Sequence, residues 1–424
     1  MTTLASNVTK EAFETMSPLE RSVHYNTNRY RSPGSEGWSR SVAPGDPDRY
    51  LMVSADCHVV EPPNLWVERI DEKYRHRLPR LEVDKDGVKW SITEGHHPMK
   101  LRDLKMEGED LERSKVGKSD PAERLADHAR DGLDAEVIFP NRGLSMWATP
   151  DALFSQAQCA VYNDWCYETF GAHFDRIAPL ACVNTGDIDS AIGEIERTAK
   201  LGFRGLSLPC KPIWGAGGSS DANYNDREYD RLWACIQDTK MPFTFHVSTG
   251  KDPRGAKGNG GAIINYVVHS LAPTAEPIVV LCSSGILDRF PGLRFASIEA
   301  GIGWVPWMLR AMDEAYEHHH FWVFPKLSML PSEFYRKHGS ASFQEDPPGI
   351  DLMREYNLSD NFMWANDYPH HEGSWPHSQQ AIERHMGKLN DDERAKVLGL
   401  NAARLFGFDV AKLLAYRTAD AGGK

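Results

Sequence analysis

Short apolar runs alternate with longer amphipathic stretches along most of this chain, and the alternation predicts its fold. Apolar runs of strand type occur near residues 51, 136, 178, 205, 244, 279, 295 and 362. Most of the stretches between them carry apolar residues at helical spacing, and one of these, 187–201, stops at Gly202. Eight strands separated mostly by helices predict an α/β fold of the (β/α)8 or TIM-barrel type. An open doubly wound sheet is the alternative, but no glycine-rich dinucleotide-binding turn favours it.

Three regions depart from this alternation and set the expected domain boundaries. Residues 1–48 are polar and have no amphipathic period, which predicts an extended N-terminal arm. Residues 49–410 would form the barrel, and 411–424 a C-terminal tail. Within the barrel, about 64–120 is predicted to be an insertion after the first strand, with a hairpin over 80–92. The arm could be an unstructured tail or could wrap a neighbouring chain, and we favour a homodimer or larger homo-oligomer.

Acidic residues and histidines stand where several of the predicted strands end. Asp56 and His58 follow the first strand, and residues two apart in an extended chain face the same side. His246 ends the fifth predicted strand, Glu299 the seventh and Asp367 the eighth. Barrel enzymes place their chemistry at this end of the strands. Carboxylates beside imidazoles suit a divalent metal ion.

Each of these residues also has an ordinary structural explanation. Asp56 and His58 could form a hydrogen bond where a loop begins, and a buried His246 could be satisfied by a backbone carbonyl. Glu299 and Asp367 could cap the helices that follow them. Their convergence from four separate strands on one end of the barrel is what favours a metal site.

Composition excludes several classes of function. The chain has 424 residues, which suits a barrel with insertions, and its net charge of −12 argues against nucleic acid as a partner. No segment approaches the roughly 20 apolar residues that a membrane span needs, and the N-terminus lacks the apolar core of a signal peptide. The seven cysteines form no CxxC pair, and several lie in apolar runs. This pattern predicts a protein of the reducing cytoplasm without a disulfide framework.

Four motifs resemble those of the amidohydrolase-related family, which includes aminocarboxymuconate semialdehyde decarboxylase, resorcylate decarboxylase and related hydrolases and hydratases. They read SADCHVVEP, FHV, RFPGLRFASIEAGIGWVPW and NDYPHHEGSWP. The resemblance covers roughly residues 50–406 and implies a metal-dependent TIM barrel with one divalent ion, usually zinc and sometimes manganese. Carried over by position, it implies that the metal ligands are Asp56, His58, His246 and Asp367.

Two departures from the family pattern guide the choice of reaction. The first pair is D-x-H, where many members have H-x-H or E-x-H. The decarboxylases also tend to carry a histidine after strand six. At the end of the predicted sixth strand this chain reads LCSSG (281–285), which has no histidine. The preferred hypothesis is therefore a hydrolase of a small organic substrate, and a decarboxylase or hydratase on the same metal is the alternative. Glu299 matches a glutamate that some hydratase and carbon–carbon hydrolase relatives use near the metal.

The hydrolase hypothesis assigns a role to each residue. The ion, expected to be Zn²⁺ with Mn²⁺ as the alternative, would lower the pKa of bound water toward about 7. Asp367 or a neighbouring histidine, His370 or His371, would move the proton. His246 would act as ligand within the catalytic set, and Glu299 is a further candidate ligand. A metal-free binding protein on a degenerate barrel is a third hypothesis, and the retained ligand set argues against it.

Overall fold

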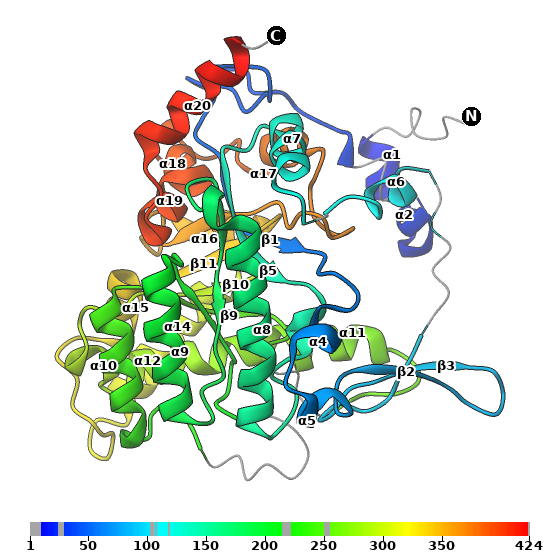
Figure 1. Cartoon of the computed structure of the whole chain (residues 1–424). Helices are drawn as coiled ribbons and strands as arrows, with labels where there is room; N and C mark the ends of the chain where they lie inside the picture. Colours follow the sequence, from blue (N-terminus) through cyan, green and yellow to red (C-terminus); the bar gives the residue numbers. More distant parts are fainter. Residues whose placement is uncertain are drawn as a thin grey trace.

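Parallel strands that follow one another along the chain form the central barrel (Figure 1). The computed structural model describes residues 10–23, 29–101, 106, 108–117, 119–213, 222–249 and 255–422. The barrel strands are β1 (Val53–Val59), β5 (Ala135–Pro140), β6 (Ile177–Pro179), β7 (Ala181–Cys182), β8 (Leu206–Leu208), β9 (Phe243–His246), β10 (Phe295–Ile298), β11 (Gly339–Phe343) and β12 (Phe362–Trp364). Only Leu180 separates β6 from β7, so the two together act as the third barrel strand.

The pairing of the strands follows their order in the chain. One sheet has the order β1-β5-β6 and the other runs from β7 to β12, and every pair between these neighbours is parallel. A bridge between Cys57 and Tyr368 joins β1 to the segment that follows β12. These strands are buried along their length, as expected for parallel strands covered by helices. The (β/α)8 prediction is confirmed.

The helices begin and end where short-range chemistry favours it. Asp120 accepts a hydrogen bond from the backbone of Glu123, and Gly132 ends the same helix in the left-handed conformation. Around the barrel lie α7 (Pro121–Asp131), α8 (Ala152–Phe170), α9 (Ile188–Leu201), α10 (Asp230–Thr239), α12 (Ala275–Ser283), α13 (Ile286–Arg289), α14 (Trp304–His318), α15 (Pro331–His338), α16 (Pro347–Met353), α17 (Ser378–His385), α18 (Asp391–Ala395) and α19 (Asn401–Phe406).

One predicted strand is a helix, and one strand was missed. The apolar run 278–283 lies in α12, where Ile278, Leu281 and Cys282 are buried at helical spacing. A short apolar run cannot be assigned from periodicity alone, because a buried helix and a buried strand look alike. The missing strand is β11, where the sequence has no apolar run of strand type. Glu299 therefore follows the sixth barrel strand, not the seventh.

The insertion after β1 projects from the barrel. It begins with α4 (Leu65–Arg69) and α5 (Glu72–Arg75) and continues as an antiparallel sheet of β2 (Arg80–Val83), β3 (Lys89–Ile92) and β4 (Met99–Lys100). The hairpin predicted over 80–92 is confirmed by the pairing of β2 with β3. Figure 1 shows this sheet standing away from the barrel. Helix α6 (Gly108–Arg113) follows, and 102–105, 107 and 118 of the predicted insertion lie outside the described residues.

Both ends of the chain contain described structure that contacts the barrel. The predicted arm includes α1 (Lys10–Thr15) and α2 (Pro18–Val23), and further along it Val42 is fully buried in the main core. The predicted C-terminal tail belongs to α20 (Val410–Gly422), where Arg417 bonds both oxygens of Asp134. Among the described helices, none combines the length and the apolar character needed to cross a membrane.

Candidate metal centre

Side chains from four barrel strands meet at the carboxyl end of the barrel. Asp56 and His58 lie within β1 itself, two residues apart, and both are fully buried. His246 is the last residue of β9, and Glu299 follows β10 directly. Asp367 lies three residues beyond β12. The predicted convergence of these residues is therefore present in the structure.

The distances between these side chains are those of groups that surround one small volume. His246 Nε2 lies 3.3 Å from Asp56 Oδ1 and 3.4 Å from Glu299 Oε2. His58 Nε2 lies 3.6 Å from Asp56 Oδ1, 3.8 Å from Glu299 Oε2 and 3.5 Å from Asp367 Oδ1. Two overlapping groups within the described residues have spacing suited to a metal ion: Asp56, His58, His246 and Glu299; and His58, Glu299, Asp367 and His370.

Backbone hydrogen bonds fix which nitrogen of each histidine faces this volume. His58 Nδ1 lies 2.8 Å from the carbonyl oxygen of Pro140, and His246 Nδ1 lies 2.7 Å from that of Val247. A carbonyl only accepts, so each Nδ1 carries a proton, and each Nε2 faces the volume, where it offers a lone pair to a metal ion once it is deprotonated. This is the arrangement in which a metal-binding histidine is held by a second partner.

Several polar atoms at the centre have no hydrogen-bond partner among the described residues, although they are buried. They are Asp56 Oδ2, His58 Nε2 and both carboxylate oxygens of Asp367. Leaving a buried polar atom unpaired costs about 1–3 kcal/mol, so such atoms normally have partners. A divalent cation would satisfy all of them at once, and the donor set of imidazole and carboxylate fits one.

The two acids that follow strands also have an unusual backbone conformation. Glu299 has φ of 62° and Asp367 has φ of 51°, in the left-handed region that non-glycine residues rarely adopt. Neither residue caps a helix by its side chain in the way that the simpler explanation required. Strain of this kind clusters at functional sites, where the surrounding structure holds it in place.

Burial and neighbouring charges shift the pKa values of the cluster in opposite directions. Burial raises the pKa of Glu299 to about 7, and together with the Glu299 and Asp56 carboxylates it raises the pKa of Asp367 well above its usual range. Burial opposes the charged form of His246, but Asp56 outweighs it and raises the pKa of His246 to about 9. Ionising all the acids together is thus unfavourable until a cation is present.

His370 lies at the open side of the cluster. Its Nδ1 is 2.9 Å from Asp367 Oδ1, although the angle is poor for a hydrogen bond, and its ring stacks on that of His58 with centroids 4.0 Å apart. His371, the other histidine proposed to move a proton, instead pairs with Glu372 at 2.7 Å and is exposed. Of the two neighbouring histidines, the structure therefore brings only His370 into contact with the cluster.

A buried network on α7 supports the ligands and was missed in the sequence. Arg124 donates to both oxygens of Glu136 at 2.7 and 2.5 Å and to the carbonyl oxygen of His58 at 3.0 Å. His128 Nε2 lies 3.1 Å from the same Glu136 carboxylate. A glutamate inside the apolar run of β5 is the signal that could have revealed this network, because buried carboxylates need partners.

A second network ties β1 to the segment around Asp367. Asn366 Oδ1 accepts from the Ser54 hydroxyl at 3.0 Å, and Asn366 Nδ2 donates to Asp131 at 3.0 Å. The backbone N–H of Asp367 donates to the carbonyl of Asp56 at 3.1 Å. Burial raises the pKa of Asp131 to about 7. These bonds fix the position of Asp367 relative to Asp56 in β1.

Fold and cluster together define a (β/α)8 barrel with a buried site that can hold a divalent metal. The chain belongs to the amidohydrolase family: the family model described as amidohydrolase matches residues 55–408. It is thus an enzyme of the amidohydrolase superfamily, as the motifs predicted. No curated protein matches the chain.

Solved structures with the same fold match this chain over almost the whole of their own length. An amidohydrolase from Mycobacterium avium subsp. paratuberculosis K-10 is 18% identical with a TM-score of 0.67, over 85% of this chain and 99% of that one. The 5-carboxyvanillate decarboxylase of Sphingomonas paucimobilis is 22% identical with a TM-score of 0.59, over 85% and 100%. A dihydroxybenzoic acid decarboxylase from Polaromonas sp. JS666, with bound manganese and 2-nitroresorcinol, is 16% identical with a TM-score of 0.58, over 86% and 99%.

Proposed function

We propose that this chain is a metal-dependent lyase that removes CO2 from a small ring carboxylate without an oxidant. The observation that carries this proposal is the likeness, over nearly whole chains, to structures described as decarboxylases of carboxyvanillate and dihydroxybenzoate. The buried cluster is compatible with it, because a bound cation would orient the substrate and a neighbouring acid would supply the proton that replaces CO2. This reverses the order of the two hypotheses that the motifs favoured.

In this proposal some residues of the cluster bind the metal ion and others transfer protons. Asp56, His58 and His246 present one carboxylate and two Nε2 atoms toward the site and would hold the ion, with Asp367 or Glu299 as the further ligand. When bound, a divalent ion supplies positive charge that orients and polarises an oxygen-bearing substrate. We propose Zn²⁺ or Mn²⁺, since both accept this mixture of ligands.

The proposed decarboxylation consumes one proton for each CO2 that leaves. The bond between the ring carbon and the carboxyl carbon breaks, CO2 leaves, and the electron pair stays on the ring carbon until a proton replaces the lost group. We infer that Asp367 delivers that proton, because it is buried within the cluster and contacts both His58 and the partly exposed His370. His370, half-buried beside it, can return a proton from solvent.

Hydrolysis by a metal-activated water remains a second candidate, favoured by one specific residue. Glu299 directly follows the sixth barrel strand, β10, at the point where the resemblance leads us to expect a histidine in the decarboxylases. The predicted sixth strand placed this position at 281–285, a segment at the end of α12. The true sixth strand also lacks the histidine, because Glu299 stands in its place. A carboxylate there could accept a proton from water instead of donating one to carbon.

A direct test separates the two reactions. The purified chain, loaded with Zn²⁺ or Mn²⁺, is incubated without oxygen with hydroxylated and methoxylated benzoates and, in parallel, with esters and amides of the same acids. We expect CO2 from the acids, a decarboxylated ring that carries one deuterium when the reaction runs in D2O, and no turnover after chelation. Hydrolysis of the esters or amides without CO2 from any acid would establish the second candidate instead.

A further inference from the structure

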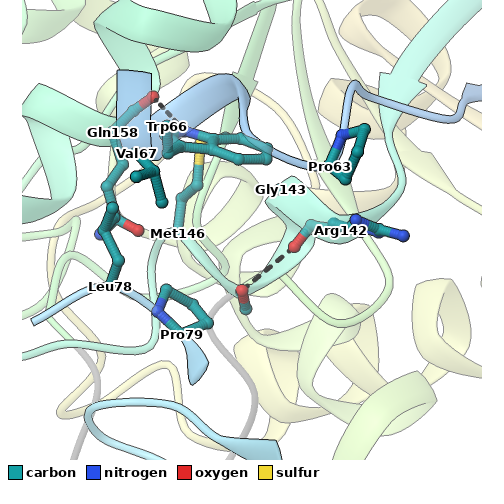
Figure 2. Close-up of a pocket in the computed structure, with 10 residues that line it drawn as sticks. Pro63, Trp66, Val67, Leu78, Pro79, Arg142, Gly143, Met146 and Gln158 are labelled. Atoms are coloured by element: carbon teal, nitrogen blue, oxygen red, sulfur yellow. Dashed lines mark hydrogen bonds between the residues drawn. The ribbon is translucent and has the colours of Figure 1, made fainter. Parts of the chain in front are cut away.

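A small cavity lies at the same end of the barrel as the metal centre. Its volume is about 150 Å³, and its walls come from the loop and α4 after β1 and from the 3-10 turn η1 (Arg142–Ser145) after β5. Figure 2 shows its apolar lining, which includes Pro63, Trp66, Leu78, Pro79 and Met146. A cavity of roughly this volume in other proteins holds one benzene-sized ring. None of the candidate metal ligands lines it.

Hydrogen bonds hold the walls of this cavity in place. The Trp66 indole N–H donates to the carbonyl of Gln158 at 3.0 Å, and the Ser145 hydroxyl donates to the carbonyl of Arg142 at 3.0 Å. The buried Glu61 carboxylate accepts from the backbone N–H groups of residues 141, 142 and 143 at 2.9 to 3.0 Å. The turn that carries Arg142 is thus anchored to the end of β1, so the cavity is formed before any ligand arrives.

Arg142 supplies the polar feature of the cavity. Its side chain is exposed and lies along the edge beside Pro63 in Figure 2. Within the described part of the chain, its guanidinium makes no ion pair. An unpaired guanidinium at the edge of an apolar cavity is suited to a carboxylate, which it can bind with two parallel hydrogen bonds.

We propose that this cavity is a second binding site, which takes a single-ring aromatic carboxylate. The ring would lie against the Trp66 indole and the Met146 thioether, both of which favour aromatic faces or edges. The carboxylate would lie at the edge and pair with the Arg142 guanidinium. This site is distinct from the metal centre and does not depend on which reaction occurs there.

The proposal gives a role to residues that the metal site does not use. The motif that begins with Asp56 and His58 continues through Glu61 to Pro63, past the ligands. Glu61 organises the turn, Pro63 forms a wall, and the carbonyl of Pro140, two residues before Arg142, holds His58. The same short segments therefore build the metal site on one side and the cavity on the other.

Binding can be measured on the full chain as purified, with 4-fluorobenzoate followed by 19F NMR. We expect dissociation in the millimolar range, as is usual for so small a ligand. Arg142→Gln should weaken binding about tenfold, the loss expected for one charge-assisted pair at a partly exposed site, whereas Arg142→Lys should recover part of it. Val67→Trp, which fills the cavity from its exposed wall, should remove this binding, and 4-fluorobenzamide should bind about tenfold more weakly than the acid.

Arg75→Gln serves as the matched control, because Arg75 is an exposed arginine of the neighbouring α5 that does not line the cavity. It should leave the affinity unchanged. The proposal is overturned if 4-fluorobenzoate does not bind, or if Arg142→Gln and Val67→Trp both bind it as the unchanged chain does. Equal binding of the acid and the amide would overturn the role of Arg142. Since the metal ligands are untouched in every variant, failure here leaves the proposed lyase activity standing.

Discussion

Asp367 carries the most specific expectation at the scale of single residues. It is fully buried, both of its oxygens lack hydrogen-bond partners among the described residues, and it lies close to His58 and His370. Asp367→Asn is nearly isosteric, so the fold should persist. The amide is a poorer ligand and cannot donate a carboxylic acid proton, so turnover should fall by about 10²–10⁴ and metal affinity should fall as well. Steady-state rates and metal content after dialysis measure the two effects.

His370→Ala is the companion variant, because His370 lies in the same turn but is only partly buried. The His370→Ala variant should keep its metal and lose less activity than Asp367→Asn, because His370 relays a proton and does not bind the ion. If Asp367→Asn turns over normally with a full complement of metal while His370→Ala loses both, the two roles are reversed.

The metal content itself is a separate expectation. The two overlapping groups share His58 and Glu299, and His58 has only one nitrogen free because the other bonds Pro140. We therefore expect about one divalent ion per chain by elemental analysis, with activity removed by chelation and restored by Zn²⁺ or Mn²⁺. A chain without transition metal that gains no activity from any added ion would refute this.

The convergence of the candidate ligand residues could be predicted because two general rules applied to them. Residues two apart in a strand share a face, which paired Asp56 with His58, and parallel strands bring their carboxyl ends together, which added His246 and Asp367. No such rule reaches Arg124 or Asn366. Their partners lie in elements distant along the chain, and only the packed structure shows which polar side chains meet.

At the scale of elements, the contact between α7 and β5 depends on a buried ion pair. Glu136 and Arg124 are both fully buried and bond each other through two contacts. Glu136→Gln would leave the Arg124 guanidinium buried without its counter-charge, which typically costs about 3–5 kcal/mol. Urea unfolding at neutral pH measures this loss. Glu82→Gln, the same change in an exposed pair with Arg80, should cost less than about 1 kcal/mol.

The same pair predicts a dependence of stability on pH. Burial opposes the ionised form of Glu136, but Arg124 outweighs it and lowers the pKa of Glu136 well below its usual range. A carboxylate with a lowered pKa in the folded state stabilises the protein above its unfolded pKa of about 4.3 and loses that contribution as the pH falls below it. The difference in stability between the unchanged chain and Glu136→Gln should therefore shrink below about pH 4. A difference that stays constant from pH 7 to pH 3 would contradict this origin.

Some helix boundaries are set by residues close by in the sequence, whereas the choice between helix and strand can depend on contacts with distant elements. Caps are local, so the start of α7 at Asp120 and the end of α9 at Gly202 could be predicted. The difference between α12 and β11 is not local. The apolar run at 278–283 became a helix, while Gly339–Phe343, which includes glycine and two serines, became a strand because β10 and β12 pair with it on both sides. Tertiary pairing overrides weak propensity.

For the whole molecule, residues 29–48 of the N-terminal arm are bound to the protein's own barrel. Arg384 donates to the carbonyls of Arg29 and Arg31 at 2.8 and 2.7 Å, and the Trp38 ring lies under the Arg394 guanidinium at 4.2 Å. Val42 is fully buried in the main core. These contacts involve residues 29–49, so a part of the chain without an amphipathic pattern still contributes to the folded unit through single anchoring side chains.

The remaining part of the arm is where we expect contact with a second copy. In α2, Leu19 is 77% exposed, and Figure 1 places α1 and α2 at the periphery of the molecule, away from the barrel strands. Short helices of this kind are marginal without a partner surface. We therefore expect the full chain to be a homodimer by light scattering at micromolar concentration. Deleting residues 1–28 should shift it toward monomer and leave its resistance to urea nearly unchanged, because residues 29–49 keep their anchors.

Deleting residues 1–48 is the control that separates the two parts of the arm. It also removes Trp38 and Val42, and the loss of their buried apolar area should lower the free energy of unfolding by about 3 kcal/mol or more. Tyr50, which bonds Asp391 at 2.5 Å and packs near Trp38, would then be uncovered. A full chain that is monomeric at micromolar concentration would show that the arm serves only its own barrel. A dimer that survives deletion of residues 1–28 would move the interface elsewhere.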